Sequence, residues 1–139
     1  MSEEKISVVV PTRNRANLLK RCLKSLKNQN YQNFEVIVID DDSKDGTKKI
    51  AKQFEKELDL KYVFQENKGS AAARNLGIKK AKGSLVAFID DDCLASKKWL
   101  EMINRTLVNL EGVEGKTVSD NGVTPFSHYV KNVKGGQCP

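Results

Sequence analysis

Three short runs of apolar and mostly β-branched residues do most to limit the folds open to this chain. They read ISVVV over residues 6–10, FEVIVI over 34–39 and SLVAFI over 84–89. They stay apolar at nearly every position instead of alternating with polar residues, which is typical of strands covered on both faces. Strands of this kind belong to parallel sheets flanked by helices, so the runs favour an α/β fold.

The segments between these runs carry apolar residues at three- and four-residue spacings, which predicts amphipathic helices. The predicted helices cover about residues 18–26, 47–58, 70–81 and 96–110, and a weaker strand is predicted over 61–65. Asn14 or Asn17 is the expected cap of the first helix, and Ser43 or Asp45 that of the second. Pro11 is expected to end the first strand. The alternation predicts a layered α/β/α sandwich with a mostly parallel sheet.

Aspartate clusters follow directly on two of the predicted strands. Asp40 and Asp41 close the second strand, and the run 90–92 closes the fourth. Because parallel strands end at the same edge of a sheet, we expect the clusters to be neighbours at the carboxyl edge, where open α/β sheets bind ligands. Such carboxylates repel one another unless a cation compensates them, and oxygen ligands suit Mg²⁺ or Mn²⁺. The pattern predicts a phosphate-bearing ligand, although phosphatases, nucleotidyltransferases and receiver domains share it.

Four linked segments resemble the family 2 glycosyltransferases, which are nucleotide-sugar-dependent enzymes of the GT-A fold. The segments read SVVVPTRNRANLLKRCLKSL, VIVIDDDSKDGT, NKGSAAARNLGIKKAKG and LVAFIDDDC, in that order. The resemblance extends from about Ile6 to Val118. It implies a donor-binding core over residues 1–118 and, over 119–139, the start of an acceptor-side region that the chain truncates.

This resemblance implies transfer of a sugar from a nucleotide-diphosphate sugar, expected to be a UDP-sugar, to an acceptor hydroxyl with inversion. It also implies Mn²⁺ or Mg²⁺ as cofactor, and leaves the acceptor open among glycans, lipids and proteins. The alternative is a donor-half module that binds nucleotide and metal without turnover. A receiver or phosphatase-like domain is a third alternative, against which the motif around Arg74 argues.

The resemblance further implies which residues form the site. A nucleotide-binding set would come from the strand ends and the start of the third helix: Pro11, Thr12, Arg13, Asn14, Asp40, Asp41, Asn67, Gly69, Arg74, Asp90 and Asp91. In this interpretation Asp41 accepts a hydrogen bond from the base. The D-x-D signature at 90–92 would supply the metal ligands, Asp92 and Asp90.

Simpler structural roles stay open for the same residues. Asp41 and Asp42 are also suited to cap the following turn together with Ser43. Arg74 would add positive charge near a diphosphate, but it would equally serve as an exposed helical arginine. The run 90–92 would also suit the acidic first turn of a helix, because carboxylates there favour the helix dipole.

No catalytic base is assigned. Glu114 falls in a predicted fifth strand, Glu111 and Asp120 fall in predicted turns, and His128 is expected to be a loop residue. In the resembling family the base comes from the acceptor side, so the catalytic residue is left unknown.

Composition sets the remaining expectations. The net charge is +6, but the lysines are spread along helical segments without interleaved aromatics, so no nucleic-acid partner is expected. Cys22, Cys93 and Cys138 are odd in number and far apart, which favours reduced thiols. The start of the chain lacks a signal-peptide pattern, so a cytoplasmic location is expected, at the inner face of the membrane if the full-length protein associates peripherally with it. Missing acceptor-half strands would leave an open sheet edge and favour self-association.

Overall fold

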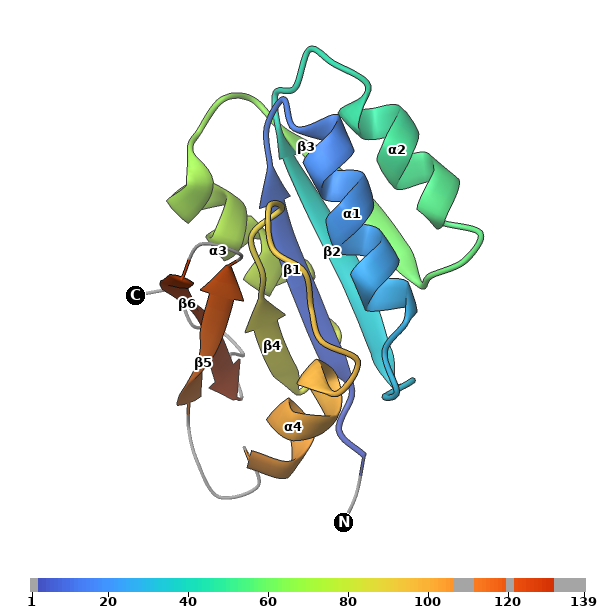
Figure 1. The fold of residues 1–139 in the computed structure, drawn as a ribbon. Helices are drawn as coiled ribbons and strands as arrows, with labels where there is room; N and C mark the ends of the chain where they lie inside the picture. Colours follow the sequence, from blue (N-terminus) through green and yellow to red (C-terminus); the bar gives the residue numbers. More distant parts are fainter. Residues whose placement is uncertain (1–2, 107–111, 120–121, 132–139) are drawn as a thin grey trace.

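The computed structural model describes residues 3–106, 112–119 and 122–131. The strands are β1 Ile6–Thr12, β2 Phe34–Asp41, β3 Leu60–Gln65, β4 Leu85–Phe88, β5 Gly112–Ser119 and β6 Gly122–Lys131. The helices are α1 Ala16–Lys27, α2 Thr47–Phe54, α3 Ser70–Lys80 and α4 Trp99–Thr106. They build one sheet in the order β3-β2-β1-β4-β6-β5 (Figure 1).

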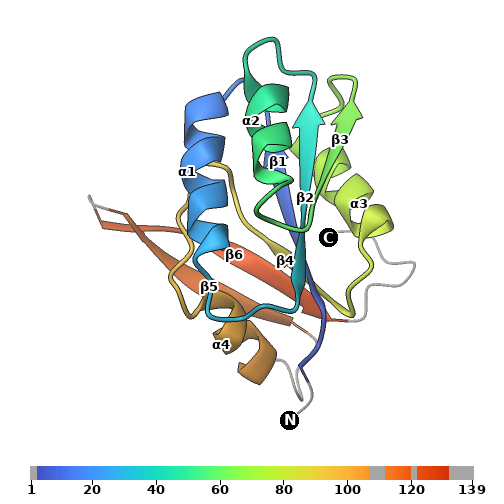
Figure 2. The same cartoon turned by 90° about the vertical axis from the view of Figure 1, so that its right-hand side faces the viewer.

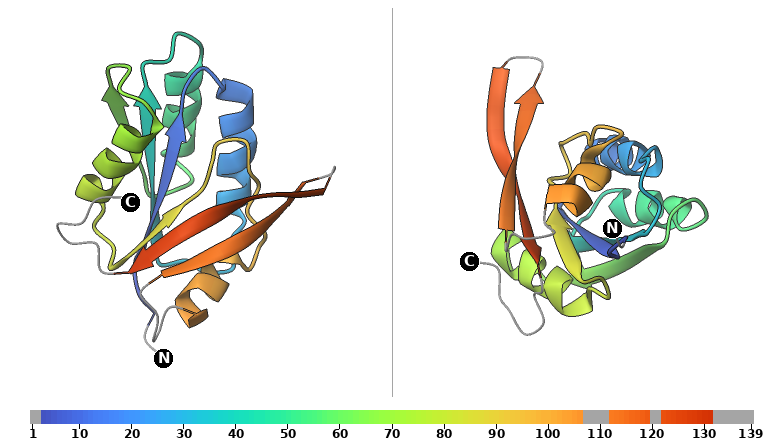
Figure 3. Two further views of the ribbon diagram at one scale, coloured as in Figure 1. Left: turned by 90° about the vertical axis from the view of Figure 1, so that its left-hand side faces the viewer. Right: turned by 90° about the horizontal axis from the view of Figure 1, so that it is seen from below.

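The first four strands are parallel, whereas β6 is antiparallel to both β4 and β5. The prediction of an α/β fold with a mostly parallel sheet is therefore confirmed. The β5–β6 hairpin lies across the parallel strands rather than along them (Figure 3). None of the described helices is both long and apolar enough to cross a membrane.

Helices cover both faces of the parallel strands because successive residues of each strand point to opposite sides. In β1, Val8 and Val10 pack in one core with Leu19 and Leu23 of α1, while Val9 packs in the other core with Ala73 of α3. Helices α1 and α2 run side by side on the first face (Figure 2). This arrangement explains why the strand sequences are apolar at nearly every position.

The prediction that Pro11 ends the first strand is wrong. Strand β1 continues through Pro11 to Thr12, which pairs with Asp40 of β2. The carbonyl of Val9 accepts a hydrogen bond from Ile89, so the odd-numbered residues of β1 bond toward β4. Pairing between β1 and β4 ends at Val9 and Phe88, and the missing N–H of Pro11 therefore falls where no ladder partner remains.

The starts of α1 and α2 share one hydrogen-bond acceptor, Asp45, in the loop between β2 and α2. Asp45 Oδ1 accepts a hydrogen bond from the backbone N–H of Thr47 (3.0 Å), the first residue of α2, although Gly46 and not Asp45 or Ser43 occupies the cap position. Its Oδ2 accepts one from the backbone N–H of Ala16 (3.1 Å), the first residue of α1. The predicted caps Asn14 and Asn17 are wrong: residue 15 precedes α1 without a side-chain cap, and the Asn14 side chain instead accepts from the backbone N–H of Lys44.

Two helices are shorter than predicted. Helix α2 ends at Phe54, where the chain tightens into a turn that still places Leu58 against the core. Helix α4 begins at Trp99 rather than near residue 96, and the preceding segment is instead hydrogen-bonded to α1 and the residues after it. Ser25 Oγ accepts a hydrogen bond from Ala95 N–H in that segment.

The C-terminal strands correct one further prediction. His128 lies inside β6 rather than in a loop, because pairing with β4 and β5 gives this polar segment partners on both sides. Glu114 lies in β5, which confirms the predicted fifth strand. Glu111, Asp120 and Cys138 lie outside the described residues.

Two small buried residues of α3, Ala73 and Gly77, bring that helix close to the sheet. A Cβ atom added at Gly77 would lie 2.3 Å from Val9 Cγ1 and 2.9 Å from Val9 Cγ2. Only glycine therefore fits where α3 crosses β1.

Candidate functional site

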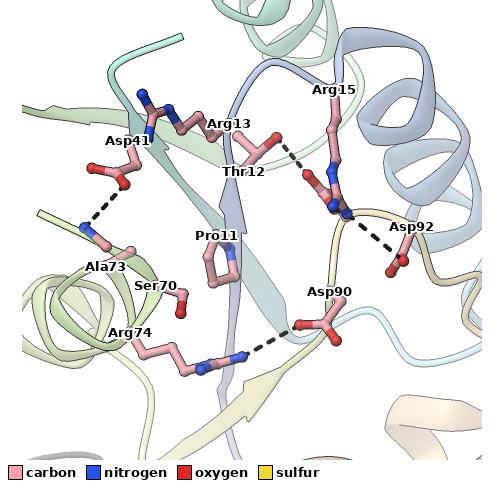
Figure 4. A pocket seen from close by; sticks show the side chains of 12 residues that line it. Pro11, Thr12, Arg13, Arg15, Asp41, Ser70, Ala73, Arg74, Asp90 and Asp92 are labelled. Atoms are coloured by element: carbon pink, nitrogen blue, oxygen red, sulfur yellow. Dashed lines mark hydrogen bonds and ion pairs between the residues drawn. The ribbon is translucent and has the colours of Figure 1, made fainter. Parts of the chain in front are cut away.

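A hollow of about 470 Å³ opens at the carboxyl edge of the parallel strands (Figure 4). Its lining combines four carboxylates with three guanidinium groups and small residues: Pro11, Thr12, Arg13, Arg15, Asp41, Gly69, Ser70, Ala73, Arg74, Asp90, Asp91 and Asp92. The ends of β1 and β2, the segment after β4 and the start of α3 meet here. We call this hollow the carboxyl-edge pocket.

Asp41 forms one end of this pocket. Its Oδ1 accepts hydrogen bonds from Lys68 N–H (2.7 Å) and Gln65 Nε2 (3.0 Å), and its Oδ2 accepts one from Gly69 N–H (3.0 Å). Burial alone would raise the pKa of Asp41, but these hydrogen bonds and the charge of Arg13 outweigh it and hold the pKa below its ordinary value. The carboxylate is therefore ionised at neutral pH.

The alternative that Asp41 caps the turn after its own strand is wrong. Its partners lie at the end of β3 and in the connection from β3 to α3, and the backbone N–H of Ser43 donates to Asp40 instead (2.9 Å). Asp42 adopts a left-handed φ of 65° and pairs with Lys44 at 2.8 Å. The two neighbouring aspartates thus support different loops.

We expect Asp41→Asn to lower the free energy of unfolding by about 2–3 kcal/mol at pH 7, because an amide cannot accept from donors on both of its ends. The pKa of Asp41 in the folded protein lies below its ordinary value of 3.8. The ionised carboxylate therefore contributes its full stabilisation above pH 3.8, and this contribution is lost as the pH falls through the pKa of the folded state. Urea unfolding at pH 7 and at low pH measures this. The difference in the free energy of unfolding between the wild type and Asp41→Asn should become smaller at low pH.

Asp59→Asn serves as the matched control, because the Asp59 side chain is 70% exposed and its ion pair with Lys5 spans 3.8 Å. It should change stability little at either pH. A constant gap between Asp41→Asn and the wild type across the pH range would contradict the ionised, hydrogen-bonded state of Asp41.

The opposite end of the pocket is the aspartate run that follows β4. Its middle member, Asp91, is buried and points inward, where it accepts hydrogen bonds from Thr12 Oγ1 (2.9 Å) and from Arg15 (3.2 Å). Burial raises the pKa of Asp91, and these two partners offset that effect only in part. Asp91 thereby joins the end of β1 and the start of α1 to the segment after β4.

The outer members of this run, Asp90 and Asp92, are exposed and face the pocket. Arg74 lies 3.5 Å from Asp90 Oδ1, and Arg15 lies 3.7 Å from Asp92 Oδ2. Ligand atoms of Asp90, Asp92 and Cys93 all lie within 4.8 Å of one another. Burial and the adjacent aspartates raise the pKa of the Cys93 thiol to about 11, so the two carboxylates are the stronger ligands at neutral pH. This donor set fits a hard divalent cation.

Most of the sequence-predicted site residues meet in the carboxyl-edge pocket. Those that line it are Pro11, Thr12, Arg13, Asp41, Gly69, Arg74, Asp90, Asp91 and Asp92. Three others do not line it. Asp40 is buried against Tyr62, Asn67 accepts a hydrogen bond from Arg13 (2.7 Å), and Asn14 bonds to the loop after β2.

Sequence reasoning missed three lining residues, Arg15, Ser70 and Ala73. Arg15 could have been found, because it lies in the connection after the first strand and so at the same sheet edge as the aspartates. Its contact with Asp91 joins positions 76 residues apart, a pairing that no local pattern indicates.

Fold and pocket together define a parallel α/β domain with a charged ligand site at its carboxyl edge, and comparison with known proteins gives the family. Residues 7–134 match glycosyl transferase family 2. Glycosyltransferase AglE of Haloferax volcanii is 39% identical over 132 residues, which cover 89% of this chain and 43% of AglE. The chain belongs to glycosyl transferase family 2.

Solved structures agree with this assignment. TarS 1-349 of S. aureus, in complex with UDP-GlcNAc, aligns with a TM-score of 0.78 and 30% identity over 87% of this chain and 37% of that one. Mannosyltransferase PcManGT of Pyrobaculum calidifontis, in complex with GDP-Man and Mn²⁺, aligns with a TM-score of 0.79 over 94% of this chain and 45% of that one, and its 23% identity shows a shared fold. The chain spans less than half the length of each of these three proteins.

Proposed function

We propose that the chain forms the donor side of a glycosyltransferase that binds a UDP-sugar with a divalent cation and transfers the sugar, with inversion, to an acceptor hydroxyl. The observation that carries the proposal is the carboxyl-edge pocket, which has an ionised, fixed carboxylate at one end and two exposed carboxylates at the other. Three guanidinium groups lie between and beside them, as an anionic diphosphate requires.

The carboxylate of Asp41 favours uracil as the base of the bound nucleotide. A carboxylate can only accept hydrogen bonds, so it favours a base that presents an N–H group, as uracil does at its ring nitrogen. Of the described contacts to Asp41, Oδ1 takes two and Oδ2 takes one, which leaves Oδ2 a further acceptor position. Cytosine would present a lone pair at the same place and leave the buried carboxylate facing an acceptor.

The start of α3 supports binding of the diphosphate. Gly69 has a φ of 90°, a conformation that favours glycine, and it lines the pocket together with Ser70, the first residue of the helix. Backbone N–H groups at a helix start attract anions, and Arg74 adds a full charge one turn further along. In this proposal Arg74 binds the diphosphate and is not merely an exposed helical arginine.

Asp92 and Asp90 would hold the cation, Mn²⁺ or Mg²⁺, because their oxygens lie close together and face the pocket. When bound, such a cation neutralises negative charge on a departing nucleoside diphosphate. Asp91 holds the turn between these two ligands through Thr12 and Arg15. In this proposal the pocket carboxylates serve the nucleotide and the cation, so the base for the acceptor hydroxyl belongs to the acceptor side, which begins near residue 119.

Calorimetric titration of the purified chain with UDP, with and without Mn²⁺, tests the proposal. We expect Mn²⁺ to tighten UDP binding, and CDP to bind roughly 5- to 100-fold more weakly, as expected for a buried acceptor left unpaired. GDP is the second control, because PcManGT shares the fold and holds GDP-Man.

Two results of this titration would count against the proposal. No nucleotide binding in the presence of Mn²⁺ would contradict the donor site as a whole, whereas equal affinity for UDP and CDP would contradict the role of Asp41 alone. Release of UDP from a UDP-sugar then separates a transferase from a module that only binds.

A further inference from the structure

The two helices that share one face of the sheet are unusually rich in positive charge. Helices α1 and α2 contain no aspartate or glutamate and carry seven exposed cations: Lys20, Arg21, Lys24, Lys27, Lys48, Lys49 and Lys52. The net charge of the whole chain is +6, so the rest of the chain sums to −1. The whole excess of positive charge in this protein is therefore carried by two neighbouring helices, which we call the α1–α2 basic face.

The same charge pattern occurs on both helices. Residues 20–24 read KRCLK and residues 48–52 read KKIAK, each with cations at the first, second and fifth positions. In each helix the interleaved positions face the core, through Cys22 and Leu23 in α1 and through Ala51 in α2. Both helices connect parallel strands and so run in the same direction, side by side (Figure 2). Their charged stripes consequently lie next to each other.

Few of these cations are neutralised by the protein itself. Lys27 pairs with Glu57 at 3.2 Å and Lys52 with Glu55 at 3.1 Å, both acids in the turn after α2. Lys48 and Lys52 also lie over the ring of Tyr62. Across residues 3–106, no carboxylate pairs with Lys20, Arg21, Lys24, Lys48 or Lys49. Clustered cations without counter-charges repel one another, so an anionic partner would stabilise this face.

We propose that the α1–α2 basic face docks on a bilayer surface that contains anionic phospholipids. The face is formed by two parallel helices, and its cations are spread along both rather than converging on one point. Lys48 and Lys52 lie at its margin, where α2 adjoins Tyr62 of β3. Such an arrangement fits a planar array of phosphate headgroups better than a single phosphate. Six of the seven cations are lysines, which act as point charges, and nucleic-acid surfaces usually add arginine forks or stacking aromatics.

The orientation that follows relates this face to the carboxyl-edge pocket. Arg15, the residue just before α1, lies on the pocket lining, so the pocket adjoins the N-terminal end of α1. A bilayer along the basic face would therefore lie along a helix whose start borders the pocket. This inference does not depend on the proposed donor or reaction.

Vesicle co-sedimentation tests the docking surface. The probes are vesicles of phosphatidylcholine alone and of phosphatidylcholine mixed with phosphatidylglycerol. We expect binding to the mixed vesicles only, and weakening as salt is raised. The variant Lys20→Gln, Lys24→Gln, Lys49→Gln removes three exposed cations that have no ion pair within residues 3–106. It should bind about 100-fold more weakly, since each cation near an anionic surface contributes roughly fivefold.

The matched control is Lys79→Gln, Lys80→Gln, Lys82→Gln, which removes the same charge at exposed positions at the end of α3 and just after it. It should bind like the wild type, and circular dichroism should show both variants folded. Three results would overturn the proposal: no binding to anionic vesicles, an equal loss in both variants, or tighter binding to duplex DNA than to vesicles.

Discussion

Asp92→Ala should weaken Mn²⁺ binding by at least about 100-fold, because loss of an outer-sphere partner alone costs 10- to 100-fold and Asp92 is proposed as a direct ligand. The side chain is 51% exposed, and its one described ion pair, with Arg15, spans 3.7 Å. Its removal should therefore leave folding almost unchanged. Calorimetric titration with Mn²⁺ measures the effect without any need for turnover.

The same variant should keep the part of UDP binding that does not require metal, since Asp41 lies at the other end of the pocket. Asp59→Ala is the matched control: it removes one exposed carboxylate at the start of β3, a position outside the pocket lining. It should bind Mn²⁺ like the wild type. Wild-type Mn²⁺ affinity in Asp92→Ala would show that the aspartate run after β4 is structural and not a metal site.

Gly77→Ala is expected to destabilise the fold by about 1–3 kcal/mol, the usual cost of overpacking a core. In an exposed helix the same change would gain about 1 kcal/mol from helix propensity. Here the new methyl group would lie 2.3 Å from Val9 Cγ1 and 3.2 Å from Val9 Cβ, so rotation of the valine cannot relieve the clash. Urea unfolding measures the loss.

A double-mutant cycle separates the clash from other effects of Gly77→Ala. In the Val9→Ala background the γ-methyl groups are gone, and Gly77→Ala should be close to neutral. Gly46→Ala is the second control, because a Cβ there meets nothing within 4 Å and its φ of −78° suits any residue. If Gly77→Ala proved as harmless as Gly46→Ala, the close approach of α3 to β1 would be wrong.

Elements that depend on local pattern were predictable from the sequence. The apolar strands and the amphipathic helices were predicted in the right order, because burial of one or both faces of an element sets the spacing of its apolar residues. The meeting of the aspartate runs followed from the rule that parallel strands end at one edge. Helix ends were less predictable, since α2 stops at Phe54 although apolar spacing continues to Leu58.

Contacts between segments that lie far apart in the chain could not be predicted from the sequence. The cap of α1 comes from Asp45, 29 residues away, and not from either neighbouring asparagine. Asp40 and Asp41 are adjacent in the chain, yet only Asp41 lines the pocket, because alternate residues of a strand point to opposite faces. The basic residues looked scattered along the sequence and gathered on one face only once α1 and α2 lay side by side (Figure 2).

The carboxylate of Asp45 accepts hydrogen bonds from the first residues of both α1 and α2. Hydrogen bonds from Thr47 and from Ala16 hold the pKa of Asp45 below its ordinary value, so the acid stays charged and both donors stay engaged. Loss of this one carboxylate would therefore remove a hydrogen-bond partner from the first turns of both helices at once, so the two helix starts are coupled although they lie 29 residues or more apart from each other in the chain.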